Sequence, residues 1–173
     1  MTALRRVLLA APLVLSACGD SRDARTADAV EQDAAYADMQ TRGQLVMGVD
    51  QYASAHVFED LPDGGRILLD RADARDTGDI AAIRRHMRDV AAAFRAGDFS
   101  KPFQVHAQPV PGSAVMAALR AAISYEALDR PRGAEVRIRT SDSTAVRAIH
   151  TFLGFQRSAH HAGGHDSSSR STP

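Results

Sequence analysis

The chain has 173 residues, with 21 basic and 21 acidic side chains and a formal net charge of zero. This balance offers no basic field for nucleic acid and no acidic field for a polycation. Tryptophan is absent and aromatic residues make up 5% of the chain, which argues against a broad stacking platform for bases or sugars. The length suits one domain with a modest core.

The first segment, residues 1–17, has the composition of a secretory signal. Arg5 and Arg6 precede an apolar run over residues 7–15, and small residues follow it. A positively charged start, an apolar stretch and a small-residue cleavage site predict a signal peptide that is not part of the fold. We expect the mature chain to begin at Cys18, which is the only cysteine in the sequence.

The residues Leu15-Ser16-Ala17-Cys18 resemble the lipobox of bacterial lipoproteins. The resemblance implies cleavage before Cys18 and attachment of several acyl chains to that residue, which would anchor the protein because each buried CH₂ contributes about 0.8 kcal/mol. By the same resemblance, Gly19 in place of Asp favours the outer membrane. We therefore expect a lipid-anchored protein of the bacterial envelope that faces the periplasm. The alternative is an ordinary signal peptide followed by a chance cysteine.

Composition divides the rest of the chain into three parts. Residues 18–42 are polar, and Val30, Tyr36 and Met39 are their only large apolar groups, so we expect a flexible spacer with transient helix. The folded domain is predicted over residues 43–161. Residues 162–173 are rich in glycine and serine and lack apolar content, which predicts a disordered tail.

Alternation and β-branched residues predict the strands of this domain. They fall at residues 44–59, 66–71, 103–108, 121–128 and 135–140. The alanine-rich residues 114–120 suit a helix or a strand, and we expect a strand. In the last predicted strand, Val136 and Ile138 should face the core and Arg137 and Arg139 the solvent.

Two helices are predicted from apolar residues at helical spacing. The first runs over residues 79–96, with Asp76 or Thr77 as its cap and Gly97 as its end. The second follows Ser141 or Asp142 and continues to about His160. Their buried stripes are predicted to contain Ile80, Ile83, Met87, Val90 and Phe94 in the first helix, and Val146, Ile149, Phe152 and Leu153 in the second.

These elements suggest an internal repeat. Proline- and glycine-containing turns at residues 61–65 and 129–133 each join two strands, and a capped helix follows each hairpin. The order predicts an α+β fold, with an antiparallel sheet built from two β-hairpin–helix units and both helices on one face.

No recognised catalytic motif occurs. The sequence contains no Walker loop, G-x-S-x-G, H-E-x-x-H or C-x-x-C pattern. Asp50 and Glu59 are nine residues apart, which places them on opposite faces of a strand and gives no carboxylate pair.

Histidine and methionine carry the remaining chemical signal. His56 and His106 lie on predicted strands, and His86 and His150 lie beside the apolar stripes of the two helices. Met47, Met87 and Met116 also fall in the domain. Imidazole and thioether suit copper in an oxidising compartment, and imidazole also suits zinc. The alternative is that each histidine is half-buried and satisfied by one hydrogen bond, with methionine as core filler.

The topology predicts which histidines meet. We expect His56 and His150 to share a ligand at the boundary between the sheet and the helices, with His86 or His106 as a third group. A second cluster, His160, His161 and His165, lies at the start of the tail and is expected to bind divalent metal weakly.

A further resemblance covers residues 46–51 with His56, residues 148–156, and the pair His160-His161. Together they resemble small bacterial lipoproteins of unassigned function. The resemblance implies no activity. It draws attention to Asp50, Gln51, His56, His150 and Gln156.

The sequence thus predicts a lipid-anchored envelope domain that binds a small ligand, with a metal ion favoured over an organic molecule and copper over zinc. One alternative is an envelope interaction protein without a cofactor, which docks a partner through the sheet face or through Arg137 and Arg139. Another is a hydrolase or transferase with a histidine base, although no residue is positioned as its nucleophile. Whether the protein is an enzyme stays open.

Overall fold

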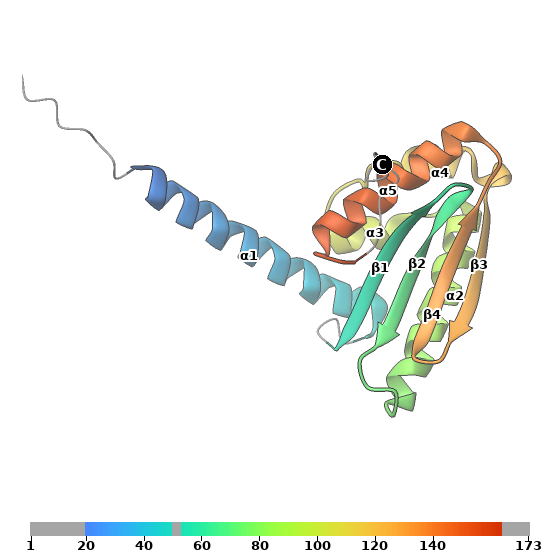
Figure 1. Ribbon diagram of the computed structural model, residues 1–173, viewed down its shortest axis with the longest axis horizontal. Helices are drawn as coiled ribbons and strands as arrows, with labels where there is room; N and C mark the ends of the chain where they lie inside the picture. Colours follow the sequence, from blue (N-terminus) through green and yellow to red (C-terminus); the bar gives the residue numbers. More distant parts are fainter. Residues whose placement is uncertain (1–19, 50–52, 164–173) are drawn as a thin grey trace, which may run out of the picture. The chain divides into compact units, whose positions relative to one another are not determined.

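The structure is a computed structural model that describes residues 20–49 and 53–163. The predicted signal peptide, Cys18, Asp50, Gln51 and His165 lie outside these residues. The elements in chain order are α1 (Asp20–Met47), β1 (Ser54–Leu61), β2 (Gly64–Arg71), α2 (Thr77–Ala96), α3 (Ser100–His106), α4 (Ser113–Ala118), the 3₁₀ helix η1 (Arg120–Ala122), β3 (Ser124–Arg130), β4 (Gly133–Arg139) and α5 (Ser143–Ala159) (Figure 1).

The four strands form one antiparallel sheet in the order β1-β2-β4-β3 (Figure 1). Two hairpins, β1–β2 and β3–β4, are joined through the pairing of β2 with β4. Each hairpin turns on a proline and the residue after it, and the next strand begins at a glycine, Gly64 or Gly133. A Cβ atom at Gly133 would lie 1.9 Å from the carbonyl oxygen of Leu69, so the second turn requires glycine.

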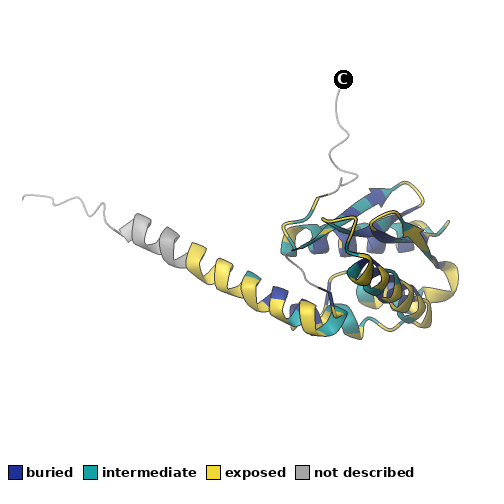
Figure 2. Ribbon diagram, turned by 90° about the horizontal axis from the view of Figure 1, so that it is seen from below, coloured by how far each residue is buried: buried dark blue, intermediate teal, exposed yellow. Residues whose placement is uncertain are grey.

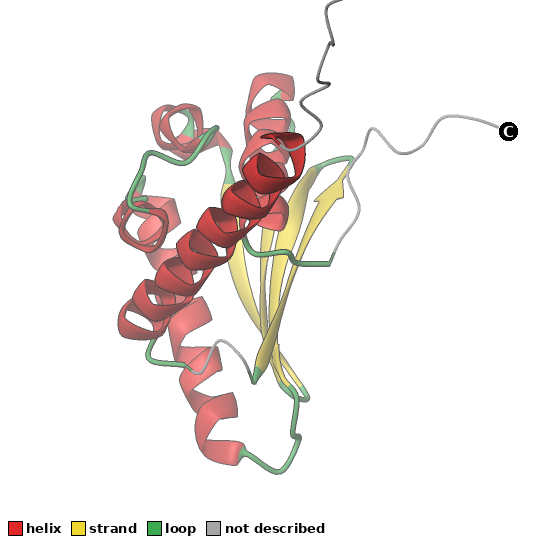
Figure 3. Ribbon diagram, turned by 90° about the vertical axis from the view of Figure 1, so that its left-hand side faces the viewer, coloured by secondary structure: helices red, strands yellow, loops and turns green. Residues whose placement is uncertain are grey.

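Helices α2 and α5 lie on one face of this sheet (Figures 1 and 3). Helix α5 packs on β1 and β2, whereas α2 packs mainly on β3 and β4. Each helix therefore covers the hairpin of the other repeat. The predicted α+β fold of two hairpin–helix units is confirmed.

Local signals define both long helices. The Asp76 side chain accepts a hydrogen bond from the Asp79 backbone N–H, and Gly97 ends α2 in the left-handed conformation. Asp142 caps α5 by accepting from the N–H groups of Thr144 and Ala145. The predicted stripes are buried except for Val146, which is partly exposed. Figure 2 shows the buried residues concentrated between the sheet and these helices.

The other face of the sheet is covered by charged side chains. Arg66 pairs with Glu59 at 2.6 Å and approaches Glu135 at 3.9 Å, and Arg130 pairs with Asp70 at 3.2 Å and with Glu135 at 3.5 Å. Opposite charges on neighbouring strands stabilise a solvated sheet face. This network lets the face remain without a second layer.

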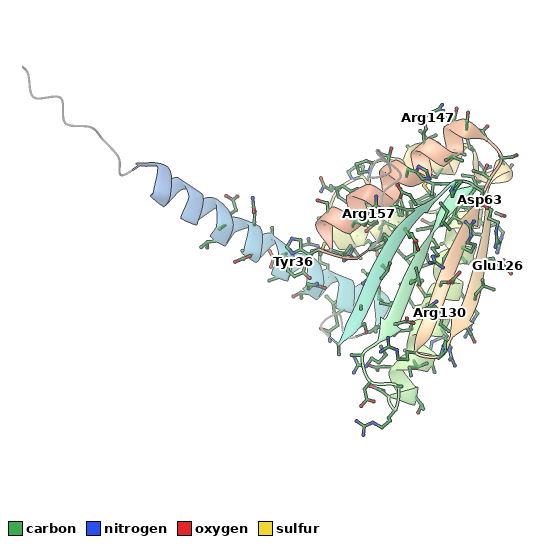
Figure 4. The ribbon with its side chains drawn as sticks, viewed as in Figure 1. Tyr36, Asp63, Glu126, Arg130, Arg147 and Arg157 are labelled. Atoms are coloured by element: carbon green, nitrogen blue, oxygen red, sulfur yellow. The ribbon has the colours of Figure 1, made fainter. Side chains whose placement is uncertain are left out.

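The expected arginine strip lies at the end of the same face. Arg137 pairs with Asp63 at the β1–β2 turn, and Arg139 pairs with Glu126 on β3 at 3.0 Å. Figure 4 labels the two acidic partners, Asp63 and Glu126. Val136 and Ile138 are fully buried and Arg139 is exposed, as predicted. Arg137 was also expected to face the solvent, but its side chain is only 11% exposed because it pairs with Asp63 and donates to the Gly65 carbonyl oxygen.

Helix α1 replaces the flexible spacer expected over residues 18–42 and the first part of the strand expected over residues 44–59. The helix extends from Asp20 to Met47, and the strand begins only at Ser54. Met39 and Gln40 are buried, and the Arg42 guanidinium donates to the Val105 carbonyl oxygen at 2.8 Å. This hydrogen bond joins α1 to α3, which is distant in sequence and which a reading of residues 18–42 alone does not take into account.

The chain divides into two compact units between Ala34 and Ala35, and the second unit contains the whole sheet. The structured part therefore begins before residue 43. It also extends beyond residue 161, because Gly163 forms a parallel bridge with Val57 and its carbonyl accepts from the Phe58 N–H at 3.0 Å. Within the described residues, none of the helices is both long enough and apolar enough to cross a membrane.

Two predicted strands are helical. Residues 103–108 contribute instead to α3, where Asp98 accepts from the Ser100 N–H at 2.8 Å and Pro102 occupies the first turn, a position that tolerates proline. The apparent alternation rested on four side chains, and adjacent burial of Val105 and His106 reflects a helix. Residues 114–120 form α4 and the start of η1, as their alanine content allows.

Candidate metal centre

A small cavity of about 70 Å³ lies between the sheet, the end of α1, and helices α2, α3 and α5. Most of its wall is apolar, including Phe58 on β1 and Phe152 on α5. Its polar lining consists mainly of imidazoles. Those that contribute are His56, His86, His106 and His160.

Each of these histidines comes from a different element. His56 lies on the helix-facing side of β1, two residues before Phe58, and His86 lies on the buried stripe of α2. His106 is the last residue of α3, and His160 follows the last turn of α5. The strand period, the buried stripe of α2 and the ends of α3 and α5 therefore direct four imidazoles from distant parts of the chain to one cavity.

His160 is the centre of this group. Its ring centre lies 5.1 Å from that of His56 and 5.1 Å from that of His106. Two nitrogens on one ion lie at most about 4 Å apart, since each metal–nitrogen bond is about 2.0–2.1 Å. For ring centres 5.1 Å apart, that separation requires the two rings to turn toward a common point.

Gln156 orients one of the rings. Its Oε1 lies 2.8 Å from His106 Nε2, and both side chains are buried. An amide oxygen only accepts hydrogen bonds, so Nε2 carries the proton and Nδ1 retains its lone pair. A hydrogen bond that fixes the tautomer of a histidine is the usual support of an imidazole ligand.

Burial keeps the cavity imidazoles uncharged. It lowers the pKa of His56 and of His86 to about 4, with smaller contributions from His86 in the first case and Lys101 in the second. It lowers the pKa of His160 to about 3, assisted by the neighbouring histidines, and also lowers the pKa of His106. All four rings are therefore neutral at pH 7, which is the form that binds metal.

The sulfur atoms of two methionines complete the set of possible ligands. Met47 from the end of α1 and Met87 from α2 line the same cavity. Within the described part of the chain, no three His, Cys, Asp or Glu side chains already surround one point as metal ligands do. A centre at this cavity would therefore need either thioether sulfur or a small rearrangement of the imidazoles.

Backbone strain accompanies two of the histidines. Ala107 has φ of 54° and His161 has φ of 48°, and they are the only non-glycine residues with positive φ in the described ranges. Each directly follows a cavity histidine, His106 or His160. The left-handed conformation costs roughly 1–2 kcal/mol for such residues, and strain of this kind collects at functional sites.

His150 does not belong to this group, contrary to the predicted pairing with His56. Its Nε2 lies 3.0 Å from the Leu61 carbonyl oxygen and 2.9 Å from that of Gly64, at the β1–β2 turn. His56 is five residues before Leu61 on β1, about 16 Å along the strand at roughly 3.3 Å per residue. The two residues were expected to meet because both were placed at the boundary between the sheet and the helices. The register of α5 on the sheet instead places His150 at the β1–β2 turn.

His160, by contrast, belongs to the centre and not to a tail. The prediction that α5 continues to about His160 contained the relevant signal, because Phe152, Gln156 and His160 follow at intervals of four and share one helix face. His161 is exposed and stacks on Tyr36, with ring centres 4.5 Å apart. Gln156, indicated by the second resemblance, holds His106.

Comparisons of the chain with protein-family models, curated proteins and solved structures found no match.

Proposed function

We propose that this protein binds a metal ion, copper in preference to zinc, in the histidine-lined cavity. His160 with His56 and His106 are the principal ligands, and His86, Met47 or Met87 completes the set. The observation that supports the proposal is the convergence of four histidines, from four elements, and two methionines on one small cavity.

The chemistry of the wall favours copper. Imidazole binds both copper and zinc, whereas thioether sulfur is a soft ligand that favours Cu(I). The cavity histidines are neutral at pH 7 because burial lowers their pKa values, so no proton has to leave before the ion binds. Apolar neighbours such as Phe58 and Phe152 keep water from competing for the ion.

Metal titration of the purified full chain tests the proposal, with His165→Ala to remove a tail histidine. We expect one equivalent of copper to bind, and Zn(II) to bind more weakly. A hundredfold excess over the dissociation constant should stabilise the protein by about 2.7 kcal/mol. His56→Leu and His160→Phe should abolish the stabilisation.

His150→Gln is the matched control, because it removes a histidine of the same helix that lies outside the cavity. We expect it to retain one bound ion. The proposal is wrong if the parent chain binds no stoichiometric copper or zinc, or if His56→Leu and His160→Phe bind as the parent does.

We also propose that the domain is anchored to the outer membrane through Cys18 and faces the periplasm. The support is the lipobox-like sequence Leu15–Cys18, which ends two residues before α1 begins at Asp20. Cys18→Ser should release the protein from the membrane fraction after a carbonate wash, because no other residue can carry the acyl chains. Retention equal to that of the wild type would contradict the anchor.

A further inference from the structure

The groups that could hold an ion in the histidine-lined cavity are all uncharged. They are the four imidazoles and the thioethers of Met47 and Met87, and the remaining polar group of the wall is the neutral amide of Gln156. Among the described residues that line the cavity, none is an aspartate or a glutamate. Carboxylates are the ligands that offset the charge of a divalent ion, so an ion bound in this cavity would keep its full charge.

The one charged residue in the described lining is itself a cation. Lys101 of α3 lines the cavity and is only partly exposed. Burial is the main cause of the lowered pKa of His86, and the charge of Lys101 is the next. Asp89 does not line the cavity, and it acts on His86 in the opposite sense and more weakly. The field at this imidazole that comes from side-chain charges is therefore positive.

A second positive charge acts on another of the imidazoles. Arg42 of α1 is held beside α3 by its hydrogen bond to the Val105 carbonyl oxygen at 2.8 Å. Together with burial, its charge lowers the pKa of His106, against the hydrogen bond to Gln156, which raises it. An ion in the cavity would thus experience two fixed cations, from two helices, without a carboxylate in the described wall.

Such a field distinguishes ions by their charge. The Coulomb energy is proportional to the charge of the ion, so a fixed cation opposes a divalent ion twice as strongly as a monovalent one. The apolar wall, which includes Phe58 and Phe152, lowers the local dielectric constant and strengthens this difference. Neutral nitrogen and thioether sulfur satisfy Cu(I), which is soft and needs no anionic ligand.

We propose that the centre selects a soft monovalent ion, Cu(I), and that Lys101 is the residue that disfavours divalent Cu(II) and Zn(II). This inference rests on the proposed metal-binding function and adds to it the oxidation state of the ion and the source of the selectivity. Lys101 is not a ligand and acts only through its charge. The ion binds in the oxidation state in which it arrives, so no electron is transferred.

Equilibrium titration of the purified full chain, again with His165→Ala, tests the selection. The probes are Cu(I) without oxygen, Ag(I) as a monovalent ion that is stable in air, Cu(II) and Zn(II). We expect the parent to bind one equivalent of Cu(I) or Ag(I), and to bind Cu(I) at least about a hundredfold more tightly than Cu(II).

Lys101→Gln removes the charge. It should raise the affinity for Cu(I) and Ag(I) about threefold and that for Cu(II) and Zn(II) about tenfold, because the energy doubles with the charge of the ion. The preference for Cu(I) over Cu(II) then falls about threefold, which is about 30 mV in the potential of the bound copper at 59 mV per tenfold change. The difference should shrink at high ionic strength, since Lys101 is partly exposed.

Two variants serve as controls. Lys101→Arg keeps the charge and should keep the selectivity of the parent. Arg85→Gln removes a charge of the same sign from an exposed position on α2 that does not line the cavity, and it should bind all four ions as the parent does. Melting midpoints of the metal-free variants confirm that they are folded.

The outcomes separate this inference from the proposed function. If the parent chain binds neither copper nor zinc, both are overturned. If it binds Cu(II) as tightly as Cu(I), the metal site stands and only the selection of Cu(I) is overturned. Equal changes in affinity for monovalent and divalent ions in Lys101→Gln, or loss of the preference in Lys101→Arg, would show that the lysine acts through packing and would overturn its part in the selection.

Discussion

The two hairpin–helix repeats place different chemistry at equivalent positions. Aligned on their caps, Asp76 and Asp142, the helices put Phe94 and His160 at the same place, eighteen residues after the cap. Aligned on their turn prolines, the hairpins put Tyr125 and His56 at the same place, six residues before the proline. Phe94 meets Tyr125 with ring centres 5.8 Å apart, and His160 meets His56 at 5.1 Å.

The contact between α2 and β3 is thus ordinary aromatic packing, whereas its counterpart between α5 and β1 is a pair of imidazoles. One turn earlier a polar residue again replaces an apolar one, because α2 has Val90 where α5 has Gln156. A fold that packs with apolar groups at one of these places does not require polar groups at the other. The fold therefore does not by itself account for the histidines at α5 and β1, which is what the proposed function requires of ligands.

The largest expected effects test whether the two repeats share one core. Ile83 and Ile149 are equivalent and fully buried, so Ile83→Ala and Ile149→Ala should each lower the free energy of unfolding by about 2–5 kcal/mol. Urea unfolding measures both. A loss below about 0.5 kcal/mol in either variant, typical of surface substitutions, would contradict the equivalence.

Exchanging the side chains at the last helical turns is a sharper test of the comparison. Phe94→His places a polar ring among Phe99, Tyr125 and Phe152, and should cost about 1–3 kcal/mol. His160→Phe should be neutral or stabilising in metal-free protein while it abolishes metal binding. Equal destabilisation by both changes would show that His160 is part of the packing.

The pH dependence of stability should reflect the cavity imidazoles. Their folded pKa values lie below the ordinary value near 6.5, so between about pH 6.5 and 4 the unfolded chain binds more protons than the folded one. Stability is full above this window and falls as the pH decreases through it, by up to about 1.4 kcal/mol per pH unit for each histidine.

Denaturant unfolding of metal-free protein at pH 7, 6 and 5 measures this slope. His160→Phe removes one of the titrating groups and should make the slope less steep. Stability that is constant from pH 7 to 5 would contradict burial of the neutral rings.

The smallest expected effect concerns the strained backbone beside the site. Ala107→Gly should stabilise the protein by up to about 1 kcal/mol, because glycine adopts φ of 54° without steric cost. Ala81→Gly, at an exposed position inside α2, should instead cost about 1 kcal/mol and serves as the control. Thermal unfolding measures both changes. If both variants are less stable than the parent, Ala107 carries no strain.

Much of the fold was predictable because its signals are local. The buried stripe of α2, the caps Asp76 and Asp142, and the Pro-containing turns depend on residues a few positions apart. Helix α3 was mistaken for a strand because seven residues carry too little periodicity to separate the two. The candidate site was predicted only in part: His56, His86 and His106 meet, but His150 was chosen where His160 is the partner.

By itself, then, the amino-acid sequence determined the hairpins, the two long helices and the kinds of side chain that could bind a metal ion, which are imidazole and thioether groups. Residue type and short-range spacing decide these features. Only the tertiary structure decided which histidines share a cavity. Convergence of β1, α2, α3 and the end of α5 depends on how α5 lies across the first hairpin. It also involves the hydrogen bond from Arg42 of α1 to the Val105 carbonyl oxygen of α3, and these contacts join residues far apart in the chain. A shift of one helical turn moves an imidazole by about 5.4 Å, enough to leave the site, and no local pattern specifies that shift.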